Sequence, residues 1–146
     1  SWHKTNPTPS FRKMNFLSSC EFCIVGSKGE SKIPNFLMQK EMHNFFETAN
    51  GSAYKVTEHP TEKPLSILKW LVKIGSKEGD LILDCFAGSG TTAIACKELN
   101  RNFILIEKEK GFIDMAKKRL EQEQLNTKNI SPPNPKGMGI RNGRII

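Results

Sequence analysis

A glycine-rich turn between two apolar runs constrains the fold of this chain more than any other feature. Residues 81–86 read Leu-Ile-Leu-Asp-Cys-Phe, which is typical of a short strand that is buried on both faces. The turn at residues 87–90 follows, and residues 91–99 have the composition of a helix. Residues 103–107 form a second buried strand that ends in an acid, and residues 112–124 form a second helix. This β-α-β-α order predicts an α/β fold with a parallel sheet and right-handed crossovers.

The remainder of the chain carries weaker signals. Pro64 is suited to the first turn of a helix, and the apolar stripe after it predicts a helix that Gly75 ends. Residues 22–25 read as a short apolar strand. Residues 27–58 are polar and weakly periodic, so we expect a loop with one short helix near residues 39–46.

Composition and charge exclude several classes of protein. The chain has 146 residues, enough for one domain, and a net charge of +7. That excess lies at the two ends, since residues 1–20 and 124–146 contain basic residues and no acid. Basic ends fit contact with a polyanion, although for the Pro- and Gly-containing tail at 125–146 the pattern favours a solvated segment without regular structure. No apolar stretch reaches the length of a membrane span, and we expect no export leader.

The four cysteines are too few for a disulfide scaffold. Cys20 and Cys23 form a Cys-x-x-Cys pair, but a structural zinc site needs four ligands and the sequence has no second pair. We therefore expect no metal site. Reduced thiols also fit a cytoplasmic protein.

The glycine turn predicts a binding site. Glycine allows positive φ and a close approach of ligand, and the following helix offers free N–H groups and a positive dipole end. Glu107, at the end of the next strand, is placed to accept both hydroxyls of a ribose, which indicates an adenosine-bearing cofactor. The turn alone leaves two interpretations open: a site for an adenosine-bearing cofactor, and a strand-turn-helix unit that binds no ligand. The third glycine of a dinucleotide fingerprint is absent, so the pattern does not decide between them.

Three segments resemble the amino-group DNA methyltransferases, which methylate adenine N6 or cytosine N4. Residues 84–92 read Asp-Cys-Phe-Ala-Gly-Ser-Gly-Thr-Thr and resemble that family's S-adenosylmethionine motif, with Cys85 in place of its proline. Residues 59–64, His-Pro-Thr-Glu-Lys-Pro, and residues 2–9 resemble two further segments. Their order matches the permuted, β-type subgroup. The resemblance implies part of a Rossmann-like, S-adenosylmethionine-dependent methyltransferase fold.

The resemblance also implies roles for particular residues. Asp84 and Phe86 would line the methionine and adenine ends of the cofactor, and Glu107 would bind its ribose. The methionine carboxylate would lie at the start of the helix, where Thr91 and Thr92 would bind it, assisted by Lys63 and Thr61. The implied cofactor-binding residues are Thr61, Lys63, Asp84, Phe86, Gly88, Gly90, Thr91, Thr92 and Glu107.

The catalytic motif of this family, a polar residue followed by Pro-Pro and an aromatic residue, is missing. Residues 131–134 contain the one Pro-Pro of the chain, but Asn134 stands where the aromatic ring is needed. We therefore expect the motif upstream of Ser1, and no catalytic residue in this chain. On this interpretation residues 1–26 are a strand segment of the catalytic core and 27–58 stand in the place of a target-recognition region. Residues 59–124 then bind the cofactor, and 125–146 are a tail.

The expected partner is double-stranded DNA, with Lys4, Arg12 and Lys13 as candidate contacts. A homodimer, or a second chain with the catalytic motif, is the expected assembly. The expected activity is site-specific methylation of the restriction-modification type, on adenine N6 rather than cytosine N4. Two alternatives remain: a non-catalytic DNA- or protein-binding module with a methyltransferase scaffold, and a nicotinamide-dependent oxidoreductase.

Overall fold

The parallel strands predicted around the glycine turn form one sheet. The structure is a computed structural model, and it describes residues 1–7, 17–29, 35–49, 57–128 and 143–145. The sheet consists of β4 (Leu81–Asp84), β5 (Asn102–Leu105) and β6 (Gly143–Ile145), in the order β4-β5-β6 and parallel throughout. Helix α2 (Thr91–Glu98) connects β4 to β5, and α3 (Lys110–Lys128) follows β5. The predicted β-α-β-α order is therefore confirmed.

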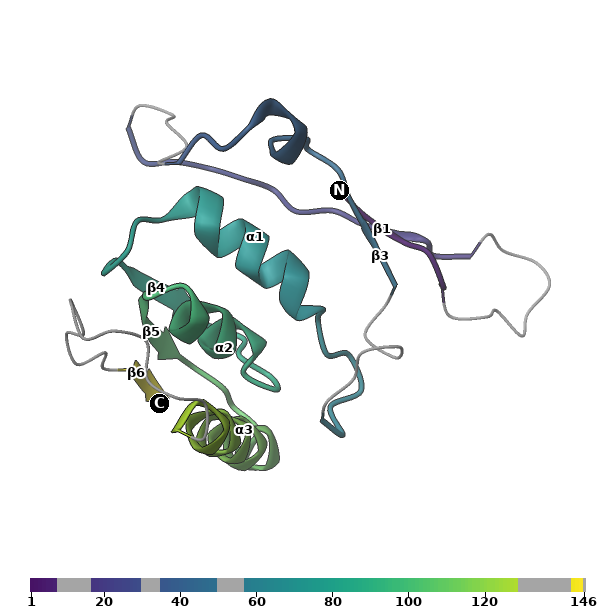
Figure 1. Ribbon diagram of the computed structural model, residues 1–146. Helices are drawn as coiled ribbons and strands as arrows, with labels where there is room; N and C mark the ends of the chain where they lie inside the picture. The colour runs from purple at the N-terminus through teal and green to yellow at the C-terminus, as the bar shows by residue number, and fades with distance from the viewer. Residues whose placement is uncertain (8–16, 30–34, 50–56, 129–142, 146) are drawn as a thin grey trace.

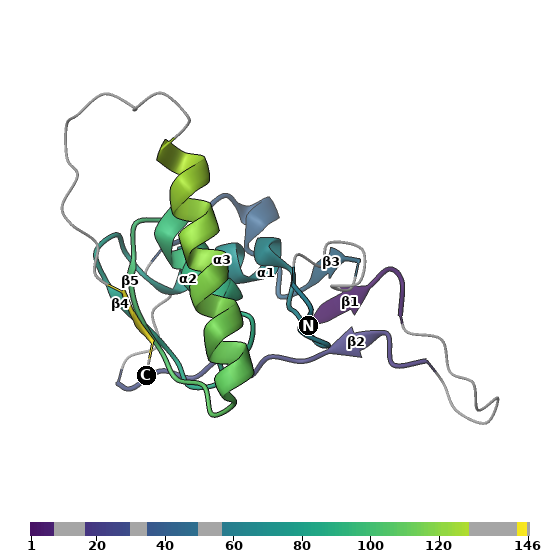
Figure 2. The same cartoon turned by 90° about the horizontal axis from the view of Figure 1, so that it is seen from below.

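The three described α-helices lie on one side of this sheet (Figures 1 and 2). On that side Phe103 and Leu105 of β5 are buried against Ala93 and Cys96 of α2, and Leu105 is 0 % exposed. Period-2 alternation places the neighbouring side chains on the opposite face.

The opposite face of β4 is open to solvent. Leu81 is 60 % exposed and Leu83 58 % exposed. The prediction that this strand is buried on both faces is therefore wrong. The reason is that no element among the described residues covers the second face of β4.

Helix α1 (Leu65–Gly75) confirms the helix predicted after Pro64. Pro64 is the N-cap residue, and Ile67 and Val72 form the buried part of the helix. The helix packs on α2, and its C-terminal end is joined to β5 by the buried Arg101. The guanidinium of Arg101 donates hydrogen bonds to the carbonyl and hydroxyl oxygens of Ser76.

A second sheet lies on the far side of α1 from β4 and β5 (Figures 1 and 2). It consists of β1 (Trp2–Lys4), β2 (Cys20–Glu21) and β3 (Phe46–Thr48) in the order β2-β1-β3, with β1 antiparallel to β2 and parallel to β3. The ring of Phe46 lies 5.7 Å from that of Trp70 on α1, and the Trp70 indole donates a hydrogen bond to the Glu41 carbonyl.

Two predictions for the N-terminal half are wrong. Residues 22–25 form no strand, and Phe22 and Ile24 are 83 % and 96 % exposed, because no described strand pairs with them. Within residues 27–58, the expected helix is only the single turn η1 (Gln39–Glu41). The segment after it forms strand β3, which pairs with β1.

The expected irregular tail is also partly wrong. Helix α3 continues to Lys128, and β6 returns the chain to the sheet beside β5, where Ile145 packs on the core. Residues 131–134, with their Pro-Pro, lie outside the described residues. None of the described helices is long and apolar enough to cross a membrane.

The one-sided core predicts a sharp difference between two leucines of neighbouring strands. We expect Leu105→Ala to lower the free energy of unfolding by about 2–5 kcal/mol, because it leaves a cavity in the buried face. Leu83→Ala is the matched control, with an expected loss below about 1 kcal/mol. Urea denaturation followed by circular dichroism measures both, and equal losses would contradict a core on one face.

Candidate functional site

A pocket of about 370 Å³ opens at the carboxyl end of β4. Its walls come from the glycine turn, the start of α2, the end of β5 and the segment that leads into α1. The lining residues are His59, Thr61, Glu62, Lys63, Leu68, Asp84, Phe86, Ala87, Gly88, Ser89, Thr91, Thr92, Glu107 and Phe112. Eight of the nine predicted cofactor-binding residues are among them, and Gly90 is the exception.

The two glycines of the turn have different neighbours. Both have positive φ, 50° at Gly88 and 76° at Gly90, a conformation that glycine adopts without strain. A side chain at Gly88 would meet the His59 ring at 2.9 Å inside the pocket. A side chain at Gly90 would meet Ala116 Cβ at 2.9 Å instead. Gly88 therefore faces the predicted site, whereas Gly90 faces α3 and makes room for that helix.

The carboxylate of Asp84 is held in place by the turn. One oxygen accepts a hydrogen bond from the Thr92 hydroxyl at 2.6 Å, and the other accepts one from the Phe86 backbone N–H at 3.0 Å. Asp84 and Thr92 thus lie together, as the sequence predicts, but the hydroxyl of Thr92 is used within the chain. The Phe86 ring is 91 % exposed at the rim of the pocket.

Glu107 lies beside the turn, as predicted for the acid at the end of the second strand. Its carboxylate accepts hydrogen bonds from the backbone N–H groups of Gly88 at 2.8 Å, Lys108 at 2.8 Å and Glu109 at 3.0 Å. The bonds from Glu109 and Gly88 are the main reason that the pKa of the Glu107 carboxyl is lowered. The site therefore presents a charged, oriented acceptor to any ligand with hydroxyl groups.

The two lysines predicted for different roles share one partner. Lys63 Nζ lies 3.0 Å from one carboxylate oxygen of Glu21, and Lys4 Nζ lies 2.8 Å from the other. Both ammonium groups also lie over the Trp2 ring, within 6 Å of its centroid. Partial burial alone would raise the pKa of Glu21. The hydrogen bonds from the two lysines together outweigh that effect, so the pKa of Glu21 is lowered overall.

The other candidate DNA contacts, Arg12 and Lys13, lie outside the described residues. Lys4 is described, and its side chain is only 15 % exposed because of its contacts with Glu21 and Trp2. Cys20 and Cys23 are free and exposed. Within the described ranges, no group of three or more His, Cys, Asp or Glu side chains could hold a metal ion.

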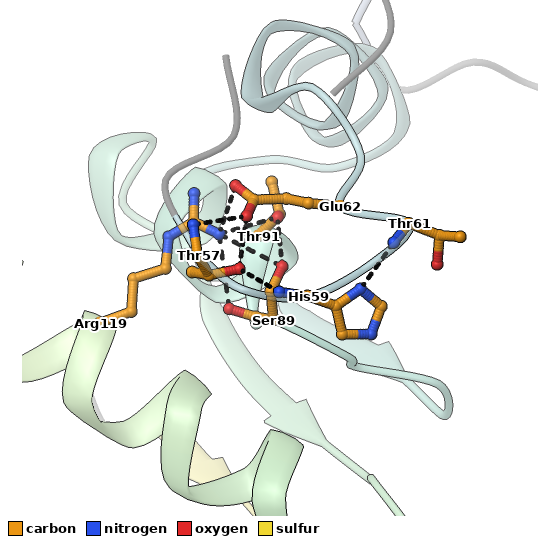
Figure 3. Close-up of polar contacts among 7 residues, drawn as sticks. All are labelled: Thr57, His59, Thr61, Glu62, Ser89, Thr91 and Arg119. Carbon is orange, nitrogen blue, oxygen red and sulfur yellow. Dashed lines mark hydrogen bonds and ion pairs between the residues drawn. The ribbon is translucent and has the colours of Figure 1, made fainter. Parts of the chain in front are cut away.

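Sequence reasoning missed a buried ion pair in the pocket wall, which Glu62 helps to line. Arg119 of α3 lies 3.1 Å from Glu62, and their side chains are 8 % and 3 % exposed (Figure 3). Helical spacing contained a signal, because Arg119 falls on the same face as Phe112, Met115 and Ala116 and so is directed at the core. The ring of Phe112 also packs against the His59 ring in a tilted arrangement, with 4.3 Å between centroids.

A parallel sheet with a glycine turn and an acid at the end of the next strand is typical of α/β proteins that bind a nucleoside-containing ligand. The N6/N4 methyltransferase family model, described as DNA methylase, matches residues 1–118. The chain therefore belongs to this DNA methylase family, which excludes the nicotinamide-dependent oxidoreductase.

Individual relatives agree with this membership. The chain is 38% identical over 134 residues to the Type II methyltransferase M2.DpnII of Streptococcus pneumoniae, which covers 84% of this chain and 50% of the relative. It is 36% identical over 133 residues to the Type II methyltransferase M2.MboI of Moraxella bovis, covering 84% and 48%. The chain thus spans about half the length of the curated relatives it matches.

Solved structures resemble the chain in the same way. The crystal structure of the M1.HpyAVI–SAM complex is 32% identical, with a TM-score of 0.53 over 81% of this chain and 58% of that chain. The PvuII DNA methyltransferase, described as cytosine-N4-specific, is 17% identical with a TM-score of 0.58 over 93% and 51%. The first supports the methyltransferase fold through sequence and structure, and the second through structure alone. The fold is thus part of a Rossmann-like, S-adenosylmethionine-dependent methyltransferase fold.

The contact between Gly90 and Ala116 predicts a destabilising substitution. We expect Gly90→Ala to lower the melting temperature by several degrees, because the new methyl group clashes with α3 and the backbone has positive φ. Gly75→Ala is the control, since a Cβ there meets nothing within 4 Å and needs no positive φ. Differential scanning fluorimetry measures both variants. Equal melting temperatures for Gly90→Ala and the unsubstituted chain would contradict the packing described here.

Proposed function

We propose that this chain is the S-adenosylmethionine-binding part of a DNA methyltransferase that methylates an exocyclic amino group. Adenine N6 is the favoured target, and cytosine N4 is the alternative. One observation carries the proposal: the pocket brings the Glu107 carboxylate, the Asp84 carboxylate and the start of α2 to one edge of the parallel sheet.

The residues present fit this cofactor. A volume of about 370 Å³ lies within the range of small-molecule sites. Glu107 is a charged acceptor suited to two ribose hydroxyls, and Asp84 is an anion suited to an ammonium group. The start of α2 is suited to a carboxylate, because the first turn of a helix has N–H groups without helical partners. When bound, S-adenosylmethionine supplies an activated methyl group on its sulfonium.

The remaining pocket residues receive supporting roles. The exposed Phe86 ring would stack on the adenine, and Gly88 would allow the cofactor close to the backbone. Thr92 would act through Asp84, whose carboxylate it already orients. The methionine carboxylate would be surrounded by Thr61, Lys63 and Thr91. The ammonium group of Lys63 would then contact two carboxylates, that of the cofactor and that of Glu21. Gly90 would contribute indirectly, by seating α3 against the turn.

Methyl transfer also needs the polar-Pro-Pro-aromatic motif, which would hold the target amino group and stack on the extruded base. We infer that polypeptide beyond these 146 residues supplies it, either in the same chain or in a second one. The open face of β4 offers a site for that part, because Leu81 and Leu83 are exposed there. Neighbouring exposed apolar side chains of this kind are suited to an interface.

Double-stranded DNA is the proposed substrate, and the cytoplasm the proposed compartment. The basic N-terminal segment, with Lys4, Arg12 and Lys13, would add phosphate contacts. Because Lys4 is paired with Glu21, we expect its contribution to be smaller than that of a free lysine. The second candidate function, a non-catalytic DNA- or protein-binding module, predicts DNA binding without cofactor binding.

Isothermal titration calorimetry tests the cofactor assignment. We expect the chain to bind S-adenosylmethionine and not NAD, and Glu107→Ala to weaken binding about 10- to 100-fold, because two hydrogen bonds to the ribose are lost. Glu109→Ala is the matched control, since it removes the same charge from an exposed neighbour outside the pocket. If Glu107→Ala and Glu109→Ala bound equally well, the ribose assignment would be wrong.

A transfer assay tests the proposed division of labour. We expect the purified 146-residue chain to transfer no labelled methyl group from S-adenosylmethionine to duplex DNA, since it lacks the motif that holds the target base. A complete DNA methyltransferase assayed on the same DNA is the positive control. Labelled methyl groups on DNA after incubation with this chain alone would contradict the division.

A further inference from the structure

The ion pair between Glu62 and Arg119 belongs to a network that connects three separate parts of the chain (Figure 3). On one side, Glu62 accepts hydrogen bonds from the backbone N–H of Thr57 at 3.0 Å and from its hydroxyl at 2.6 Å. On the other side, the same Arg119 nitrogen that faces Glu62 donates to the Thr91 hydroxyl at 3.0 Å and lies 3.4 Å from the Ser89 carbonyl oxygen. The segment before α1, the glycine turn and α3 are thus tied together.

The network also sets the path of the segment that borders the pocket. The backbone N–H of His59 donates to the Thr57 hydroxyl at 3.2 Å, and the backbone N–H of Thr61 donates to the His59 ring at 3.2 Å. Glu62 therefore lies at the centre of a folded loop, and Thr61 and Lys63 stand on either side of it in sequence. Both of these neighbours line the pocket.

We propose that Glu62 and Arg119 are positioning residues, which hold the segment at 57–63 against the glycine turn and so give the cofactor pocket its shape. This inference rests on the proposed cofactor function. Neither residue touches the reacting atoms in this role. Glu62 acts through the position of Thr61 and Lys63, and Arg119 acts through Thr91.

The burial of the pair favours this role over plain stabilisation. Two charges removed from water are expensive, and well-packed apolar residues of similar size are commonly as stabilising as a buried ion pair. Compared with apolar packing, an ion pair with directional hydrogen bonds fixes the relative orientation of the segments that it joins. Here the additional hydrogen bonds of the pair run to separate parts of the chain, from Glu62 to Thr57 and from Arg119 to the glycine turn, so the pair fixes the position of one part relative to the other.

Two measurements on Glu62→Gln test the proposal. The substitution keeps the shape and the acceptor for Thr57 but removes the charge that faces Arg119. We expect the Kd for S-adenosylmethionine to rise about 10-fold in calorimetry. We also expect the amide hydrogens of Thr57, His59 and Thr61 to exchange about 10-fold faster, with exchange in β4 and β5 unchanged.

Glu98→Gln is the matched control, because Glu98 pairs with Lys69 on the surface between α1 and α2. We expect this variant to match the unsubstituted chain in affinity and in exchange at residues 57–63. If Glu62→Gln fails to fold, Thr57→Ala replaces it, with the Kd and the exchange of the Thr61 amide as the readouts, because this variant removes one donor to Glu62 and also the hydroxyl that accepts the His59 N–H. The same local change is expected, with a smaller amplitude.

The outcomes separate the inference from the function on which it rests. If the unsubstituted chain binds no S-adenosylmethionine, the proposed function fails, and the exchange data still decide whether the pair holds the segment. Unchanged affinity and unchanged exchange in Glu62→Gln would overturn the inference. The inference would also be overturned if exchange became faster by the same factor in β4, in β5 and at residues 57–63. That result would mean that the pair only stabilises the fold as a whole.

Discussion

The side chain that Gly90 lacks would meet Ala116 Cβ at 2.9 Å, so α3 lies directly against the turn between β4 and α2. This approach determines much of the pocket. Arg119 is three residues beyond Ala116 and therefore on the same face of α3, within reach of the Thr91 hydroxyl and of Glu62. Gly90 does not line the pocket, but the close packing that it allows places α3, and with it Arg119, beside the pocket wall.

The sheet of β4, β5 and β6 is covered by described elements on one face only. The three helices bury Phe103 and Leu105 on one face, while Leu81 and Leu83 meet solvent on the other. The described residues that line the pocket all fall within 59–112. Contacts among residues 57–119, including the distant pair of Glu62 and Arg119, assemble the part that would bind the cofactor, whereas no element among the described residues covers the exposed face of β4.

Local patterns could be read from the sequence, and distant pairing could not. The order of strands and helices around the glycine turn, and the nearness of Asp84 and Glu107, follow from short-range spacing and the geometry of parallel strands. Strand β3 was unreadable because its partner β1 lies more than 40 residues away. Residues 22–25 have the composition of a strand but lack a described neighbour. Arg119 is a charged residue on a mostly apolar helix face, and only the tertiary structure reveals its partner.

The charge near the pocket is smaller than the sequence suggests, because Lys4 and Lys63 share the carboxylate of Glu21. Two ammonium groups and one carboxylate leave one unit of positive charge beside the pocket. A ligand carboxylate at Lys63 would have to compete with Glu21, whose lowered pKa keeps it ionised. Since Glu21 belongs to β2 and Lys63 to the segment before α1, such a ligand would act on the contact between the N-terminal sheet and the pocket. If Lys63 binds the cofactor carboxylate as proposed, cofactor binding and the placement of the N-terminal sheet would be linked through the Glu21 carboxylate.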